Sequence, residues 1–145
     1  MSDTLRPFHL AIPVTDLELA KKWYRQVFHC SLGRESSSWV DFNFFGHQLV
    51  VHLVTDNRDS LKRNLVDGKQ VPPRHFGIIL DPEEWKKLAD KCKKLNLEFR
   101  IEPHNRFRNR VGEQFTFFID DPFGNTLEFK AFQDDEQIFA VGTHP

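Results

Sequence analysis

The feature that most constrains the fold of this chain is an internal repeat. Residues 7–12 read Pro-Phe-His-Leu-Ala-Ile and residues 73–78 read Pro-Arg-His-Phe-Gly-Ile, so the two histidines are 75 − 9 = 66 residues apart. A helical segment with a tryptophan follows each copy, at Trp23 and at Trp85. Similarity at a fixed offset indicates duplication of one supersecondary unit. A period of 66 residues is longer than a solenoid repeat, so we expect two halves that pack together.

The hydrophobic pattern predicts the same order of elements in both halves. In the first half, Thr15 or Asp16 caps an amphipathic helix that ends near Phe28. In the second half, Asp81 caps a helix with Pro82 at its first position. The strands predicted in the first half are 8–14, 39–44 and 48–55, with a weak edge strand or turn at 33–38. The strands predicted in the second half are 74–80, one that begins at 99, 114–119 and 126–132.

These elements predict an α+β fold with two β-α-β-β-β modules. The modules span residues 6–56 and 73–133, and together they form a single domain over residues 1–145. The polar stretch 56–73 is interpreted as a linker or a mobile loop over a site.

Charge and cysteine content exclude several kinds of partner. Lys and Arg total 20 against 21 Asp and Glu, which argues against nucleic acid or an anionic membrane as a partner. The run Arg106, Arg108 and Arg110 is interpreted as a solvated loop rather than a phosphate site. No apolar stretch is long enough for a signal peptide or a membrane span. Cys30 and Cys92 show no disulfide framework, so we expect a soluble, cytoplasmic protein.

Three potential metal ligands, His9, His75 and Glu128, each lie inside an apolar strand. Duplicated halves around a pseudo-twofold axis would bring the two histidines together near that axis, and a divalent cation would make a buried carboxylate tolerable. Two histidines and one carboxylate on one face of a metal are typical of non-haem Fe(II) oxygenases, although Zn²⁺, Ni²⁺ or Mn²⁺ can use the same ligands. Taken singly, each histidine could be a core residue and Glu128 could face solvent, but the matched positions favour one metal ion.

Two further histidines are candidate catalytic residues. His52 could be a fourth ligand or a base, and His104 could be an acid or base, although an exposed loop histidine is the plainer interpretation. Side chains alternate between the two faces of the predicted strand 114–119, so Gln114 and Thr116 share one face and Phe115 and Phe117 the other. The sequence does not show which face lines a pocket. No Gly-rich phosphate loop, GxSxG or HExxH motif occurs. The candidates to stack on an aromatic substrate are Phe42, Phe44, Phe115 and Phe117.

Two segments carry a resemblance to a known family. Residues 8–17, Phe-His-Leu-Ala-Ile-Pro-Val-Thr-Asp-Leu, and residues 121–129, Asp-Pro-Phe-Gly-Asn-Thr-Leu-Glu-Phe, are similar to the vicinal oxygen chelate superfamily. This superfamily includes glyoxalase I, bleomycin- and fosfomycin-resistance proteins and extradiol dioxygenases. The chain most resembles its small predicted extradiol dioxygenase subgroup. The resemblance implies paired modules whose curved mixed sheets enclose a metal held by His9, His75 and Glu128. Glyoxalase I usually has a fourth, carboxylate ligand, whose matching position is interpreted as His52.

The resulting hypothesis is a non-haem Fe(II) extradiol-type dioxygenase. A small molecule with two vicinal oxygens would bind the metal, and His52 or His104 would accept a proton. The alternatives are a glyoxalase-type lyase or isomerase with Zn or Ni, and a non-catalytic binding or resistance protein. The resemblance also implies a homodimer.

Overall fold

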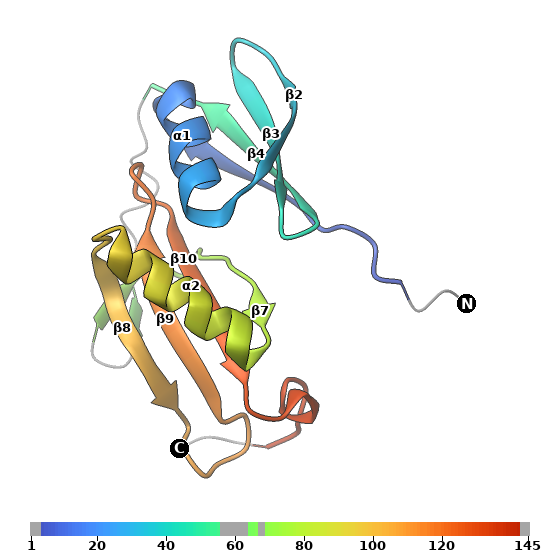
Figure 1. The fold of residues 1–145 in the computed structure, drawn as a ribbon, viewed down its shortest axis with the longest axis vertical. Helices are drawn as coiled ribbons and strands as arrows, with labels where there is room; N and C mark the ends of the chain where they lie inside the picture. Colours follow the sequence, from blue (N-terminus) through green and yellow to red (C-terminus); the bar gives the residue numbers. More distant parts are fainter. Residues whose placement is uncertain (1–3, 56–63, 67–68, 143–145) are drawn as a thin grey trace. The chain divides into compact units, whose positions relative to one another are not determined.

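The protein divides into two compact units, each built around its own four-stranded sheet. The structure is a computed structural model that describes residues 4–55, 64–66 and 69–142. Unit 1 contains the chain up to Asp59 together with Asp121–Asn125, and unit 2 contains Ser60–Asp120 and the chain from Thr126 onward. Within each unit an α-helix packs against one face of the sheet (Figure 1).

Unit 1 has the predicted order of a strand, a helix and three strands. Its sheet has the order β1-β4-β3-β2, in which β1 is parallel to β4 and the other neighbours are antiparallel. The segment predicted as a weak edge strand or turn is therefore the edge strand β2. The elements are β1 (His9–Val14), α1 (Leu17–Phe28), β2 (Ser31–Glu35), β3 (Trp39–Phe44) and β4 (His47–Leu53).

Helix α1 begins and ends at residues suited to capping. Of the two predicted N-caps, Asp16 is the one used, because its side chain accepts a hydrogen bond from the backbone N–H of Leu19 at 2.9 Å. His29 closes the helix in the left-handed conformation, with φ 55°. The helix buries Tyr24, whose ring stacks on Phe42 of β3 with the centroids 5.4 Å apart. Capping and burial together fix the helix on the sheet.

Unit 2 repeats this order of elements. Its main sheet has the order β7-β10-β9-β8, with β7 parallel to β10. The strand order matches that of unit 1 position by position, which confirms the α+β fold with two β-α-β-β-β modules. The elements are β7 (Ile79–Leu80), α2 (Pro82–Lys94), β8 (Phe99–Arg106), β9 (Gln114–Asp120), β10 (Thr126–Phe132) and a short 3-10 helix at Asp135–Gln137.

The segment between the modules differs from its prediction. The expected loop at 56–73 contains a small two-stranded sheet of β5 (Asn64–Val66) and β6 (Lys69–Val71). Strands of three residues are too short to show the alternation by which a strand is recognised in a sequence. Residues 56–63 and 67–68 of this segment lie outside the described part of the chain.

The strand predicted at 74–80 is also shorter than expected. Within residues 74–80, only β7 and an isolated parallel bridge between Phe76 and Leu127 pair with β10. Between them, a Cβ atom on Gly77 would lie 1.5 Å from the carbonyl oxygen of Glu128. Only glycine allows the two backbones to approach so closely at this point.

The turn that joins β9 to β10, Asp121–Asn125, belongs to unit 1. The buried carboxylate of Asp121 accepts a hydrogen bond from the hydroxyl of Tyr24 at 2.8 Å and from two backbone N–H groups of the turn. The side-chain amide of Asn125 donates to the same carboxylate at 2.8 Å. Gly124 has φ 83°, a conformation that favours glycine. The Asp, Gly and Asn of this segment therefore fix the turn itself.

The aromatic strands form the core between helix and sheet in both units. Phe42 and Phe44 are 1% and 3% exposed on β3. Phe115 and Phe117 face α2, where their ring centroids lie 5.6 and 5.7 Å from that of Trp85. The prediction that these four phenylalanines stack on a substrate is therefore wrong, because each belongs to a helix–sheet core.

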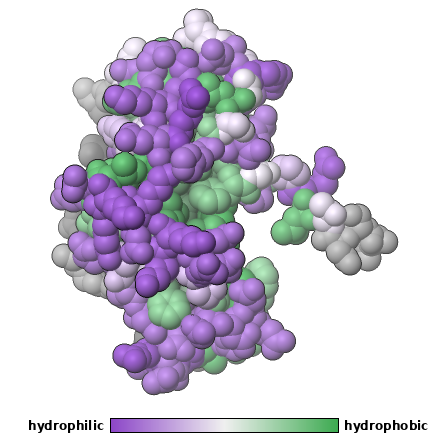
Figure 2. Space-filling view, viewed as in Figure 1, coloured by the Kyte–Doolittle hydropathy of each residue, from purple (hydrophilic) through white to green (hydrophobic). Residues whose placement is uncertain are grey.

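Polar residues cover the outer surface of the helices. Figure 2 shows mainly hydrophilic residues on the face that includes the outer side of α2. No helix among the described residues is long and apolar enough to cross a membrane. Cys30 and Cys92 are buried and unbridged, and burial raises the pKa of their thiols to about 12 and about 11. Such thiols are poor nucleophiles at neutral pH.

Candidate metal centre

Two of the three predicted metal ligands, His75 and Glu128, meet within unit 2. The imidazole Nε2 of His75 lies 3.3 Å from Oε1 of Glu128, and the carboxylate side chain is only 7% exposed. The two backbones are adjacent, since the N–H of Glu128 donates to the carbonyl of Phe76 at 2.8 Å. The glycine at position 77 allows this approach. The local fold thus brings the second-half histidine to the carboxylate.

The carboxylate of Glu128 is held in its charged form by its neighbours. Burial on its own would raise the pKa of Glu128, but hydrogen bonds with His75 and Thr116 and the charge of Lys130 lower it. The hydroxyl of Thr116 donates to Oε2 at 2.6 Å, and Nζ of Lys130 lies 3.9 Å from Oε1. A charged, mostly buried carboxylate with a defined orientation is suited to a divalent cation.

The ring of His75 is oriented by the backbone. Its Nδ1 lies 2.9 Å from the carbonyl oxygen of Pro72, and a carbonyl can only accept, so Nδ1 carries the proton. Nε2 faces Glu128 and donates to it when the ring carries its second proton. The hydrogen bond with Glu128 raises the pKa of His75, against the effect of burial. Metal-binding histidines commonly donate one ring N–H to a carbonyl and coordinate through the other nitrogen.

His9 of unit 1 has the same arrangement. Its Nδ1 lies 2.8 Å from the amide oxygen of Gln48, its register partner on β4. An amide oxygen only accepts, so Nδ1–H is the donor and Nε2 keeps the lone pair. His9 and His75 are thus held in the same tautomer by different acceptors, and both are suited to metal ligation through Nε2.

The predicted triad remains a prediction. His9 belongs to unit 1, whereas His75 and Glu128 belong to unit 2. In the part of the chain that the structure describes, no group of three or more His, Cys, Asp or Glu side chains forms a metal site. The structure therefore brings together two of the three predicted ligands and orients the third within its own unit. The donor set itself, two imidazoles and one buried carboxylate, fits a divalent transition metal.

His52 does not occupy the position equivalent to Glu128. Ala11 pairs with Val50 in unit 1, and the bridge at Phe76 together with the pairing of β7 and β10 sets Gly77 beside Glu128 in unit 2. With the two ligand histidines superposed, the equivalent of Glu128 is therefore Val50. Counting residues from the glycine turns led to the wrong match, because strand register is set by backbone pairing.

The exposed side chain of His52 lies on the same sheet face as His9, but further along β4. His9 pairs with Gln48, and His52 lies four residues further on. At the usual rise of a β-strand this separation is about 13 Å. This separation argues against His52 and His9 sharing one ion.

His104 lies on the same sheet face as Glu128. Strands β8, β9 and β10 carry His104, Thr116 and Lys130 as register partners, and Glu128 is two residues before Lys130. We call this face, opposite α2, the distal face of unit 2. Nδ1 of His104 lies 2.9 Å from the carbonyl oxygen of Glu102, so Nε2 is its basic nitrogen. The predicted catalytic histidine thus shares a surface with the proposed ligand.

The residues that support the ligands were not predicted from the sequence. Alternation showed that Gln114 and Thr116 share one face, but not that this face carries Glu128. A signal for Lys130 was present, since it lies two residues after Glu128 on the same strand and therefore on the same side. The contacts of Pro72 and Gln48 leave no pattern in the sequence, because they depend on tertiary structure.

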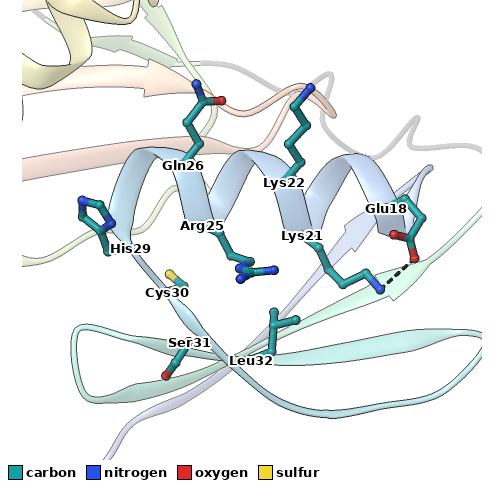
Figure 3. Close-up of a pocket in the computed structure, with 9 residues that line it drawn as sticks. All are labelled: Glu18, Lys21, Lys22, Arg25, Gln26, His29, Cys30, Ser31 and Leu32. Atoms are coloured by element: carbon teal, nitrogen blue, oxygen red, sulfur yellow. Dashed lines mark ion pairs between the residues drawn. The ribbon is translucent and has the colours of Figure 1, made fainter.

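Unit 1 contains a hollow that is not lined by its two candidate histidines. It has a volume of about 870 Å³ and lies between α1 and the start of β2 (Figure 3). Of its basic residues, Lys21 forms ion pairs with Glu18 at 2.7 Å and Glu35 at 3.0 Å. Neither His9 nor His52 lines it. Its size therefore does not identify it as the centre of the chemistry.

Comparison with known proteins identifies related sequences and structures. The family model "Glyoxalase/Bleomycin resistance protein/Dioxygenase superfamily" matches residues 6–129. A glyoxalase/bleomycin resistance protein/dioxygenase structure from Alicyclobacillus acidocaldarius is 34% identical, with a TM-score of 0.77 over 92% of this chain and 96% of that one. The fosfomycin resistance protein FosX of Listeria monocytogenes is 18% identical, with a TM-score of 0.68 over 95% and 98%. A lactoylglutathione lyase from Agrobacterium tumefaciens is 16% identical, with a TM-score of 0.62 over 97% and 100%. The last two show likeness of fold alone.

Proposed function

Because the chain belongs to the glyoxalase/bleomycin resistance protein/dioxygenase superfamily, we propose that it is an enzyme in which His9, His75 and Glu128 bind one divalent metal ion. The observation that carries the proposal is the buried carboxylate of Glu128, held in its charged form against Nε2 of His75. A buried charge is costly without a partner, and a divalent cation would take the place of the proton through which the His75 ring pairs with Glu128. The matching tautomers of the two histidines support the same conclusion.

The reaction class that these ligands favour is extradiol-type ring cleavage by a non-haem Fe(II) enzyme. Two histidines and one carboxylate leave coordination positions for two vicinal hydroxyls and for O₂. Val50, the equivalent of Glu128 in the first module, offers no fourth ligand. When bound, Fe(II) would supply Lewis acidity and the redox chemistry by which both atoms of O₂ enter the product.

The residues of the chain would position the substrate and move a proton. Nε2 of His104, on the distal face with Glu128, can accept a proton from a substrate hydroxyl. Thr116 would keep Glu128 in place through its hydrogen bond to Oε2. His52 is the second candidate base, since it is exposed on the face of unit 1 that carries His9.

The first test is elemental analysis of protein purified without added metal. We expect about one equivalent of a divalent transition metal per chain in the wild type, and loss of most of it in Glu128→Ala and His75→Ala. Glu136→Gln is the control, because Glu136 is an exposed carboxylate on the 3-10 helix. Unchanged metal content in both ligand variants would contradict the proposal.

The second test separates the dioxygenase from the alternatives. Anaerobically prepared Fe(II) protein should consume O₂ with catechols, and His104→Gln should lower kcat by about a hundredfold or more. Iron content without O₂ uptake on a broad catechol panel would contradict ring cleavage. Native Zn or Ni with turnover of a hemithioacetal would instead identify the lyase. The same preparation tests the homodimer that we propose, by sedimentation equilibrium.

A further inference from the structure

A basic hollow lies at the end of β8 in unit 2. It has a volume of about 370 Å³, and no carboxylate is among the described residues that line it. The arginine run was predicted to be a solvated loop, and Arg108 and Arg110 are exposed, but all three arginines line one hollow. The protein as a whole has a formal charge of −1, so this concentration of positive charge is local. The lining residues are His104, Asn105, Arg106, Phe107, Arg108 and Arg110.

The backbone after β8 turns the arginines towards the hollow. Phe107 and Asn109 both have φ 59°, in the left-handed region that is uncommon for residues other than glycine and an outlier for a bulky one. The N–H of Arg110 donates to the carbonyl of Phe107 at 2.9 Å, which closes the turn. The guanidinium of Arg106 lies over the Phe107 ring, 4.6 Å from its centroid, and this stacking orients its plane. Two unfavourable backbone conformations are thus part of the turn that brings the arginines together.

Two residues that line the hollow, His104 and Arg106, also belong to the distal face that carries Glu128. Arg106 and Gln114 are register partners on β8 and β9, two residues along from the pair formed by His104 and Thr116. Strands β8 and β9 lie side by side in the sheet (Figure 1). Side chains two residues apart on a strand share a face, so Arg106 lies on the same face as Thr116 and Glu128. Lys130, in register with Thr116 and His104, is a further cation on this face, with its Nζ 3.9 Å from Oε1 of Glu128.

A buried polar atom on this face lacks a partner. The side-chain amide oxygen of Gln114 has no hydrogen-bond partner among the described residues, and the residue is 5% exposed. Buried amides in native proteins are almost always hydrogen-bonded, and exceptions often mark a ligand or an ordered water. An amide oxygen only accepts, so its missing partner must be a donor, such as an ordered water or a hydroxyl group of the ligand, and not the oxyanion itself.

We infer that the hollow binds an oxyanion group, a carboxylate or a phosphate, of the small molecule whose vicinal oxygens meet the proposed metal. This inference rests on the proposed function and adds a substrate class to it. Guanidinium groups form paired hydrogen bonds with oxyanions, which accounts for arginine rather than lysine at three of the lining positions. Arg108 and Arg110 are exposed at the rim, where a ligand can reach them. The volume suits one small functional group together with part of the molecule that carries it.

Titration of the metal-free protein with inorganic phosphate and, separately, with benzoate tests the hollow directly. We expect the backbone amide NMR signals of residues 104–113 to shift with at least one of these probes, and the tighter probe identifies the type of oxyanion. Arg108→Gln/Arg110→Gln should weaken that binding about tenfold or more. These residues are exposed, so the variant should fold; Arg106→Gln gives a second, independent variant.

The control is Lys86→Gln/Lys87→Gln, which removes the same charge from the exposed side of α2. Binding that weakens equally in this control, or that is unchanged in both arginine variants, would overturn the inference, as would the absence of binding by either probe. Glu128→Ala separates the two proposals. It should lose metal and keep phosphate or benzoate binding, so failure of the metal site leaves the result for the hollow intact.

Discussion

At the scale of single residues, the charge of Glu128 matters for a contact in the structure and for the proposed metal site. Glu128 pairs with His75 in the structure, and the same oxygen atoms are the proposed metal ligands. His75, Thr116 and Lys130 keep the carboxylate ionised despite its burial, because together they lower the pKa of Glu128. The environment is therefore prepared for a cation by hydrogen bonds that already exist in the metal-free chain, and the effects of protonation and of nearby substitutions follow from it.

The stability of chelator-treated protein should depend on pH through this pair. The pKa of His75 is raised above its ordinary 6.5, so its contribution is complete below 6.5 and is lost as the pH rises through the higher folded value. The pKa of Glu128 is lowered below its ordinary 4.5, so its contribution is present above 4.5 and is lost as the pH falls through the lower folded value. The pair therefore stabilises most between about pH 4.5 and 6.5.

Urea unfolding of wild type and Glu128→Gln at a series of pH values measures this effect. The difference in free energy of unfolding should be largest between pH 4.5 and 6.5 and should shrink on both sides. A difference that grows steadily towards pH 9 would show that the pair does not act as described.

A second prediction concerns Thr116. Thr116→Val keeps the shape of the side chain and removes the hydrogen bond to Oε2 of Glu128. Metal affinity should fall about 10- to 100-fold, the usual effect of losing a partner that orients a ligand. The control is Thr126→Val, which removes a hydrogen bond to Asp120 on the same sheet face. Competition with a chelating dye gives both affinities, and equal losses in the two variants would contradict a specific role for Thr116.

At the scale of elements, the sequence predicted what local chemistry determines. Helix α1 ends where predicted, because its cap and apolar spacing are local. Strand register and the packing of the aromatic side chains depended instead on tertiary structure. The register of β1 with β4, which no local pattern encodes, made Val50 rather than His52 the equivalent of Glu128. The phenylalanine-rich strands looked equally suited to a core and to a pocket, and only the position of α2 shows that Phe117 belongs to the core.

The close approach of the backbone at Gly77 to β10 can be tested by adding a single methyl group. In Gly77→Ala the new Cβ would lie 1.5 Å from the carbonyl oxygen of Glu128, so the segment before β7 must separate from β10. We expect a loss of about 3 kcal/mol or more in the free energy of unfolding, measured by urea denaturation. Gly33→Ala on edge strand β2 is the control, because its Cβ would meet Asp41 at 3.1 Å, and we expect about 1 kcal/mol or less.

At the scale of the whole molecule, the duplication places the proposed ligands in different units. His9 is contributed by unit 1, and His75 and Glu128 by unit 2. The repeat in the sequence predicted the two modules and their matched histidines, because both are encoded locally in each half. The arrangement of the modules around a metal is not encoded in either half and remains part of the proposal.

One ion bound by ligands of both units should stabilise both, and this is a prediction about the whole chain. A metal at 100 times its Kd adds about 2.7 kcal/mol, which corresponds to a rise in Tm of roughly 5–10 °C for a chain of this size. His9→Ala, in unit 1, and Glu128→Ala, in unit 2, should each abolish this rise. The control His29→Asn removes an imidazole from unit 1 while keeping a residue that tolerates the left-handed cap of α1. Calorimetry with and without Fe(II) or Zn²⁺ provides the measurement. If His9→Ala kept the full rise in Tm while Glu128→Ala lost it, the ion would be bound by unit 2 without the first-module histidine.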